Sequence, residues 1–334
     1  MTADSLIKDL KKRQFHPVYL LHGPEPYYID QITDYFEDHV LDESERSFNL
    51  TILYGKETEF KTVVDNARRF PMMSEYQLVI LKEAQSMKEL AELETYVKNP
   101  SPSTILVICY KHGNIDGRTS FAKLLKTQAI VFESKKVYDN QMPAWITSHL
   151  ESKGFQIGPA EAALISDYLG AELSKVANEI EKLALNLPQG HKVNKDDIEK
   201  YIGISKDFNV FELQDALASR NKEKAYRIIQ YFMSNPKNNP LIVVVATLFS
   251  YFSKIYLMQF LRNSPDREVQ KSLGLSNTFF VKNYRAAAQA FSKSQTEKII
   301  HLLRIYDLKS KGVGRDSFTE QAMMQELIYK ILSA

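Results

Sequence analysis

The chain has 334 residues, and its 43 lysines and arginines against 41 aspartates and glutamates leave a net charge of only +2. This length exceeds what one hydrophobic core usually serves and predicts two or three domains. The balanced charge excludes a global electrostatic attraction to nucleic acid or anionic lipid, and the single cysteine, Cys109, excludes an intrachain disulfide.

Residues 1–15 predict a terminal amphipathic helix and not a signal peptide. Leu6, Ile7 and Leu10 recur at helical spacing among basic side chains, and no apolar segment with a cleavage site follows. The basic cluster predicts a solvated face, and contact with DNA is the alternative.

Residues 17–30, PVYLLHGPEPYYID, have the order of a phosphate-binding strand, turn and helix without its phosphate ligands. A P-loop reads G-x-x-x-x-G-K-[ST], because its backbone N–H groups and lysine bind phosphates and its hydroxyl binds Mg²⁺. Counted from Gly23, this chain has Tyr28 at the second glycine, Ile29 at the lysine and Asp30 at the hydroxyl. The stretch therefore predicts a degenerate nucleotide site, and an ordinary strand, turn and helix is the alternative.

Residues 1–139 predict an α/β domain with a parallel sheet between helices. Near-continuous apolar runs, typical of strands buried on both faces, alternate with helical patterns. The expected strands are 17–21, 48–54, 77–82, 104–110 and 129–133, and the expected helices lie near 26–40, 57–69, 87–97 and 118–126.

The end of the third strand carries a second defect. In P-loop NTPases an apolar strand ends in an Asp that helps to hold Mg²⁺. Here residues 78–81 lead into Lys82, so a cation occupies the metal-ligand position. The two defects together favour a degenerate NTPase fold over an active one.

Strand signals stop after Val137, and the rest of the chain predicts two helical domains. Residues 140–207 form a small unit with a helix around Trp145, helices through 166–170 and 172–186, and a short helix capped by Asn194. Residues 208–334 form a bundle whose expected helices are 210–219, 222–233, 240–261, 279–291, 293–312 and 317–332. The longest apolar run, 241–252, is shorter than the roughly 18 residues of a membrane span.

The sequence predicts no catalytic, cofactor or metal site. The seven histidines fall singly on different elements, and neither G-x-S-x-G, H-E-x-x-H nor C-x-x-C occurs. Hydrolase and zinc chemistry therefore have no basis in this chain.

The chain resembles the delta subunit of the bacterial DNA polymerase III clamp loader nearly end to end. The resemblance lies in residues 17–30, RRFPMMSEYQLVILKEA (68–84), NIDGRTSFAKLLK (114–126), DYLGAELSKVANEIEKL (167–183), FNVFELQDAL (208–217), NTFFVKNYRAAAQAFS (277–292) and LLRIYDLKSKG (302–312). The order and spacing of these segments carry it more than any one of them.

The resemblance implies an AAA+-type α/β domain over 1–139, a helical lid over 140–207 and a C-terminal collar over 208–334 that joins a five-subunit ring. It implies a subunit that is not an enzyme on its own, within a DNA-directed DNA polymerase (nucleotidyltransferase) holoenzyme. The subunit would bind and open the sliding clamp (beta subunit), while gamma or tau ATPase subunits act beside delta-prime to load it on primer-template DNA. The expected location is the cytoplasm, at the replication fork of the nucleoid, with no cofactor and no membrane.

In this family two hydrophobic side chains before the third strand form the clamp-binding wedge, and the matching residues are Met72 and Met73, next to Phe70 and Pro71. The preceding helix has a core-facing stripe, formed by Phe60, Val63, Val64, Ala67 and Phe70, after which Pro71 breaks the pattern. The resemblance implies a Leu-Phe type of pair, so Met-Met is a departure, and packing of the methionines under the sheet is the alternative.

Three other functions stay open at this point. An active AAA+ ATPase would bind nucleotide, against which Ile29 and Lys82 argue. A helical adaptor would bind no clamp, and a DNA-binding regulator would show a sequence preference that contacts with phosphates do not give.

Overall fold

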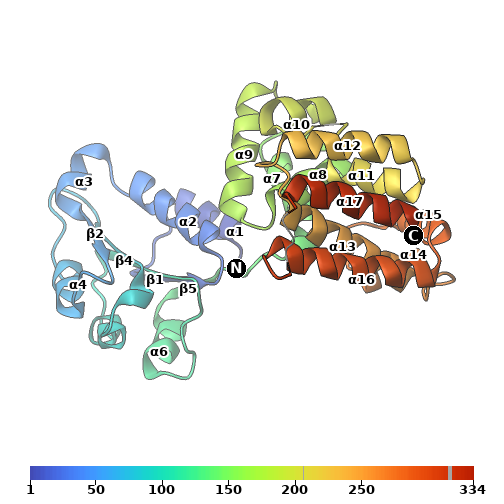
Figure 1. Cartoon of the computed structure of the whole chain (residues 1–334). Helices are drawn as coiled ribbons and strands as arrows, with labels where there is room; N and C mark the ends of the chain where they lie inside the picture. The colour runs from blue at the N-terminus through green and yellow to red at the C-terminus, as the bar shows by residue number, and fades with distance from the viewer. Residues whose placement is uncertain (206, 315–317) are drawn as a thin grey trace. The chain divides into compact units, whose positions relative to one another are not determined.

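The structure, a computed structural model, describes residues 1–205, 207–314 and 318–334. These residues divide into two compact units, Met1–Val137 and Tyr138–Ala334. The first contains a five-stranded parallel sheet with helices, and the second is almost entirely helical (Figure 1). The predicted fold class, α/β followed by all-α, is confirmed.

The sheet of the first unit has the strand order β2-β3-β4-β1-β5. Its strands are β1 (Val18–Gly23), β2 (Leu50–Tyr54), β3 (Gln77–Lys82), β4 (Thr104–Lys111) and β5 (Ile130–Glu133). All pairings in this sheet are parallel. Strand β1 pairs with β4 on one side and β5 on the other, so that Leu20 lies beside Ile108 and Val131. The five predicted strands are therefore all present.

Helices cover both faces of this sheet, because side chains of successive strand residues point to opposite faces. On one face the core is formed with α1 (Ala3–Lys11) and α2 (Pro26–His39). On the other it is formed with α4 (Phe60–Ala67), α5 (Glu94–Val97) and α6 (Ser120–Gln128). With a layer of helices on each face of the sheet, β3 and β4 are almost completely buried.

Two predicted elements of this unit were wrong in part. The second strand begins at Leu50, because residues before it form a helix, α3 (Glu43–Asn49), whose start is fixed by the N–H of Asp42 donating to Glu45 Oε2 at 2.9 Å. Of the helix expected over 87–97, the start is not helical, the middle is a 3-10 helix, η2 (Leu90–Leu93), and only the end is α5; a further 3-10 helix, η1 (Ala84–Ser86), precedes this range. The apolar residues there recur every three positions, which suits the three-residue period of a 3-10 helix.

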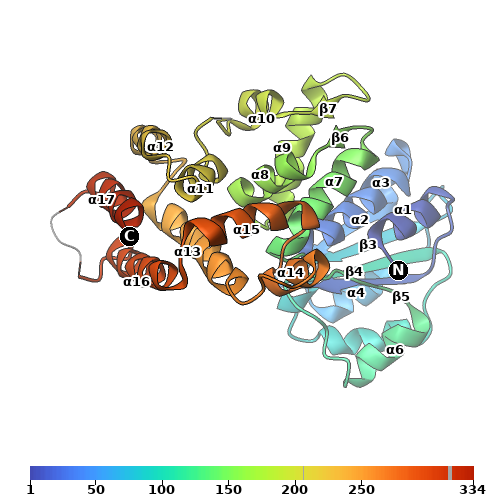
Figure 2. The ribbon, with the colours of Figure 1, turned by 90° about the vertical axis from the view of Figure 1, so that its right-hand side faces the viewer.

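The second unit begins with η3 (Asp139–Gln141) and four helices, α7 (Met142–Ser152), α8 (Pro159–Leu169), α9 (Leu173–Asn186) and α10 (Lys195–Ile202). Asn194 caps α10 as predicted, since its Oδ1 accepts from Asp196 N at 2.8 Å. A short parallel pair, β6 (Gln156–Ile157) and β7 (Lys192–Val193), was not predicted (Figure 2). The expectation that strands stop after Val137 is wrong to this extent.

One hydrophobic core runs through the remaining helices of the second unit. They are α11 (Val210–Ala218), α12 (Lys222–Ser234), α13 (Leu241–Met258), α14 (Asp266–Leu273), α15 (Val281–Ala290), which follows η4 (Thr278–Phe280), α16 (Lys293–Ser310) and α17 (Glu320–Ser333). Helix α14 was missed, because its eight residues are mostly polar. The predicted start of the last helix, Ser317, lies outside the described residues.

Helix α13 corrects the expectation that this apolar stretch is too short to cross a membrane. It continues to Met258, so 18 residues with a mean hydropathy of 1.9 pass the test of length and composition. Eight of its side chains, however, are buried in the bundle core. The core helix of a globular protein passes the same test, so the result is a weak indication of a span.

Candidate functional site

The turn after β1 leaves few backbone donors for a phosphate. Only Pro24 and Glu25 separate the end of β1 from the first residue of α2, Pro26, and the two prolines have no N–H. The N–H of Glu25 donates to Ser134 O at 3.4 Å, and the N–H of Tyr27 donates to Glu25 Oε1 at 3.1 Å. The carboxylate of Glu25 thus caps the helix N-terminus, where an anion would otherwise bind.

Gly23 is required by packing at this turn. Its φ is +146°, a region that side chains other than glycine rarely adopt, and a Cβ at this position would lie 2.0 Å from Ser134 O. This glycine therefore allows β1 to approach the chain after β5, which is a structural role and not phosphate binding.

The side chains at the other P-loop positions serve the fold. Ile29 is fully buried in the core between α2 and the sheet, and Tyr28 packs half-buried against that core. Asp30 pairs with Lys111, whose Nζ lies 2.6 Å from Asp30 Oδ1. The structure therefore places hydrophobic packing and an ion pair where a P-loop has its lysine and hydroxyl.

Lys82, at the position expected for a magnesium ligand, is held by an acidic partner. Its Nζ lies 2.5 Å from Glu37 Oε1 on α2. Burial acts to lower the pKa of Lys82, but the hydrogen bond and charge of Glu37 raise it above its ordinary value. Burial also lowers the pKa of Lys111, but hydrogen bonds and charge from Asp30 and Glu83 outweigh this effect and raise the pKa above its ordinary value. Both ammonium groups stay charged, so β3 ends in a cation where a P-loop NTPase has a metal-binding carboxylate.

A short exposed loop between α4 and β3, residues 70–74, carries the predicted wedge; we call it the tip loop. The exposed fractions are 85% for Phe70, 59% for Met72 and 101% for Met73. Residues 1–137 are all described, and their other exposed large apolar residues, Met1, Phe48 and Tyr54, do not gather in one stretch in this way. The alternative that the methionines pack under the sheet is therefore wrong.

Phe70 corrects the predicted core-facing stripe of the preceding helix. Val63 and Ala67 are fully buried as expected, but α4 ends at Ala67, so Phe70 lies outside the helix and faces solvent. Pro71, four residues after Ala67, has no N–H to continue the helix, and the carbonyl of Ala67 instead accepts hydrogen bonds from Tyr96 Oη at 3.3 Å and Thr104 Oγ1 at 2.9 Å. Both donors are buried, so the start of the tip loop is fixed to the sheet.

The middle of the tip loop is held by Asn49, which the sequence reasoning missed. The N–H of Met72 donates to Asn49 Oδ1 at 2.7 Å, and Asn49 Nδ2 donates to Met72 O at 2.9 Å and to Glu45 O at 3.1 Å. Asn49 has no exposed surface. An asparagine at the end of a short helix gives no sequence signal for a contact 23 residues away.

Met73, next to this anchor, adopts a left-handed backbone conformation with φ +53°. Non-glycine residues avoid this region, and they occupy it where the surrounding structure enforces it. Ser74 closes the other side, since its Oγ accepts from the N–H of Tyr76 at 3.4 Å just before β3. The loop thus presents an apolar, flexible thioether on a backbone that is fixed on both sides.

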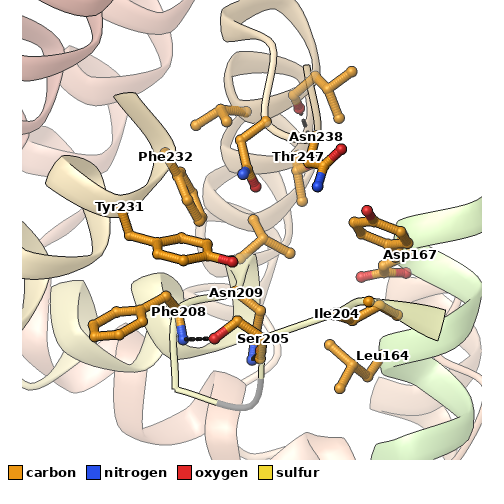
Figure 3. Close-up of a pocket in the computed structure, with 16 residues that line it drawn as sticks. Leu164, Asp167, Ile204, Ser205, Phe208, Asn209, Tyr231, Phe232, Asn238 and Thr247 are labelled. Carbon is orange, nitrogen blue, oxygen red and sulfur yellow. Dashed lines mark hydrogen bonds between the residues drawn. The ribbon is translucent and has the colours of Figure 1, made fainter. Parts of the chain in front are cut away.

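In the second unit a cleft lies between α8, the segment around residues 203–210, and helices α12 and α13 (Figure 3). Asp167 faces it, with Leu164 and Ile204 nearby. The side chain of Asp167 is open to solvent, but the walls of the cleft around it reduce its contact with water. This desolvation raises the pKa of Asp167 to about 6, while the charge of Lys254 lowers the pKa and that of Asp139 raises it. The sequence reasoning assigned no role to Asp167.

Comparison with known proteins gives a consistent result for both units. The family model described as DNA polymerase III, delta subunit, matches residues 19–135, and the one described as DNA polymerase III delta subunit, C-terminal domain, matches residues 207–331. The DNA polymerase III subunit delta of Bacillus subtilis is 25% identical, over 97% of this chain and 95% of that protein. The probable DNA polymerase III subunit delta of Aquifex aeolicus is 23% identical, over 90% of this chain and 87% of that protein.

Among solved structures, the Bacillus subtilis DNA clamp loader delta protein matches with a TM-score of 0.60 and 23% identity, over 100% of both chains. At this identity the match supports the fold. The family follows from the two sequence models, which together cover most of the chain.

Proposed function

The chain belongs to the family of the DNA polymerase III delta subunit, a clamp loader subunit of the polymerase holoenzyme, and we propose that it binds the sliding clamp through Met72 and Met73. In this proposal binding opens one interface of the clamp ring, so that the ring can be loaded onto primed DNA. The observation that carries the proposal is the exposure of both methionines on a fixed backbone.

The chemistry of the tip loop supports a protein partner with an apolar pocket. Interface anchors are large apolar side chains that enter desolvated pockets, and methionine adapts to irregular ones. An exposed pair at the end of a fixed loop would otherwise only cost solubility. Phe70 and Pro71 are proposed to contact the clamp beside the pair.

The proposed subunit neither binds nor hydrolyses ATP on its own. The support is the turn around Gly23, where the backbone donors are absent or used, and the ion pairs of Asp30 and Lys82. The energy of loading would then come from the gamma or tau ATPase subunits, and the chain would have no catalytic function of its own.

The division of labour along the chain is also a proposal. We infer a clamp-binding domain over residues 1–139, a lid over 140–207 and a collar over 208–334 that assembles with gamma or tau and delta-prime. The continuous core of α11–α17 supports the collar, since such a bundle is a packing module. Primer-template DNA would pass within the assembled complex, in the cytoplasm at the replication fork.

A clamp-release assay tests the central role. Fluorescent sliding clamp from the same source is placed on nicked circular DNA, and the chain is added without ATP. We expect the clamp to bind the chain and to leave the DNA circle. A clamp that stays on the circle and fails to bind the chain in a pull-down would contradict the proposed function.

A further inference from the structure

We propose that Asn49 is the positioning residue of the tip loop, which holds the backbone of Met72 so that both methionines are presented in their binding conformation before the clamp arrives. The proposal rests on the clamp-binding function proposed above. It adds a residue from a different helix, α3, to a site that the sequence places between α4 and β3.

The side chain of Asn49 pairs with the backbone of Met72 in the way that a neighbouring strand would, through both the N–H and the C=O group. Its side-chain amide accepts from the N–H of Met72 at 2.7 Å and donates to the carbonyl of the same residue at 2.9 Å. A side chain that pairs with both backbone groups of one residue fixes the orientation of that residue's peptide planes. The additional bond from Nδ2 to Glu45 O, at 3.1 Å, fixes the amide itself to α3.

Because Asn49 is buried, breaking its hydrogen bonds to Met72 would be energetically unfavourable. The side chain has no exposed surface, so water does not readily replace Met72 as a partner. A buried amide without its hydrogen bonds is destabilising, and the paired conformation of the loop is therefore favoured over open ones. An exposed loop of apolar residues has by itself no comparable reason to stay ordered.

The consequence appears at Met73. Its φ of +53° is unfavourable for a residue with a Cβ, and such strain persists when the neighbours determine the backbone. Asn49 holds Met72 on one side of this residue, and on the other side Ser74 bonds the backbone of Tyr76 just before β3. The result is a fully exposed Met73 side chain on a strained but defined backbone.

Fixing the loop before binding matters for affinity because binding otherwise includes the entropic cost of ordering the loop. If Asn49 is changed to alanine, Met72 loses both partners and the loop samples conformations that do not fit the clamp. We expect affinity for the clamp to fall about tenfold, through the fraction of loops in the competent conformation. Neither methionine is altered, so the loss measures positioning.

A double-mutant cycle separates positioning from general destabilisation. Asn49→Ala is measured in the wild-type chain and in the Met72→Ala/Met73→Ala chain, by titration with fluorescent clamp to high concentration. We expect the full loss of about tenfold only in the wild-type background, because without the methionines the loop has lost the two anchors that Asn49 positions. An equal loss in both backgrounds, or no loss in the wild-type background, would overturn the proposal.

Asn209→Ala is the matched control. Asn209 is also buried and also bonds the backbone, with Nδ2 donating to Ser205 O at 2.9 Å and Oδ1 accepting from Phe211 N at 3.0 Å. It lies in the second unit, so its loss should lower stability without changing clamp affinity. Equal loss of clamp affinity in this control would show that destabilisation alone explains the effect and would overturn the positioning role.

Hydrogen exchange of the wild-type chain tests the same claim without any variant. The Met72 amide lies in an exposed loop, yet it should exchange slowly, because it donates to a buried acceptor. Exchange at the rate of an open loop would refute the positioning role even if Asn49→Ala does not fold. Unchanged clamp binding by Met72→Ala/Met73→Ala is a different failure, because it overturns the proposed function first and this proposal with it.

Discussion

Truncation of the two tip-loop methionines, Met72→Ala/Met73→Ala, should abolish tight clamp binding while leaving the chain folded. The expected stability follows from exposure, since Met73 is 101% exposed and Met72 is 59% exposed. Their side chains contribute little buried surface to the fold, and surface substitutions usually change the free energy of unfolding by less than about 0.5 kcal/mol. The backbone of Met73 is unaffected, because alanine also has a Cβ and is equally strained at φ +53°.

The expected loss of affinity follows from the same exposed fractions. Full burial of a methionine side chain is worth about 1.5–3 kcal/mol. Met73 can bury all of its surface on a partner, and Met72 somewhat more than half. The pair is therefore worth about 2.4–4.8 kcal/mol, and the middle of this range corresponds to a loss of roughly a few hundredfold in affinity.

The assay measures clamp binding and thermal unfolding on the same preparation. Titration of fluorescent clamp gives Kd, and calorimetry gives Tm. Leu185→Ala is the matched control, since Leu185 is also an aliphatic side chain, 78% exposed, and lies in the second unit. It should change neither quantity.

Two results would refute this reasoning. Clamp affinity equal to that of the wild type would show that the tip loop is not the interface. A fall in Tm large enough to account for lost binding would return the methionines to a packing role, for which truncation costs about 2–5 kcal/mol of stability at each site.

Three further predictions concern the rest of the chain. Equilibrium dialysis should detect no ATP binding, because Ile29 is buried and Asp30 is paired with Lys111; Mg²⁺-dependent binding in the low micromolar range, about 8 kcal/mol, would contradict the degenerate site. A fragment that ends near Ile204 should fail to enter the clamp loader in size-exclusion chromatography, and normal entry would contradict the collar. Asp167→Asn should raise Tm above pH 6 and change it little at pH 4. The walls of the cleft desolvate Asp167 and raise its pKa from 3.8 to about 6, so between these pH values the folded state binds more protons and the wild type loses stability as pH rises. An equal change of Tm at both pH values would exclude titration of Asp167 as the cause.

The fold of the first unit could be predicted because its signal is local. A parallel strand between two layers of helices needs an apolar run, and each of the five strands is visible in its own few residues, although only β1, β3 and β4 are almost completely buried. The boundary at α3 could not be read in this way. Phe48 and Asn49 continue into the apolar run of β2, and the helix over them depends on the capping interaction of Asp42 and Glu45.

The tip loop was located from the sequence, but its geometry was not. Pro71 marks the break: it has no N–H for the carbonyl of Ala67, four residues earlier, and two hydroxyls from distant segments bond that carbonyl instead. The apolar spacing extends past the end of the helix and so predicts a core position for Phe70, although its side chain is 85% exposed. Contacts between side chains and backbone groups far apart in the chain leave no periodic pattern, and Asn49 is a second example.

The residues around the turn after β1 and the end of β3 differ from those of the tip loop in how they depend on one another. Ile29 is part of the core that joins α2 to the sheet, and a lysine there would place an ammonium group among apolar side chains. Burial lowers the pKa of Lys82 and of Lys111, but Glu37 beside the first and Asp30 and Glu83 beside the second outweigh it and raise both pKa values. Each departure from the P-loop pattern is thus compensated by a partner on a neighbouring element. Such compensation ties these residues to the stability of the first unit, whereas Met72 and Met73 contribute little to the fold and are free to serve a partner.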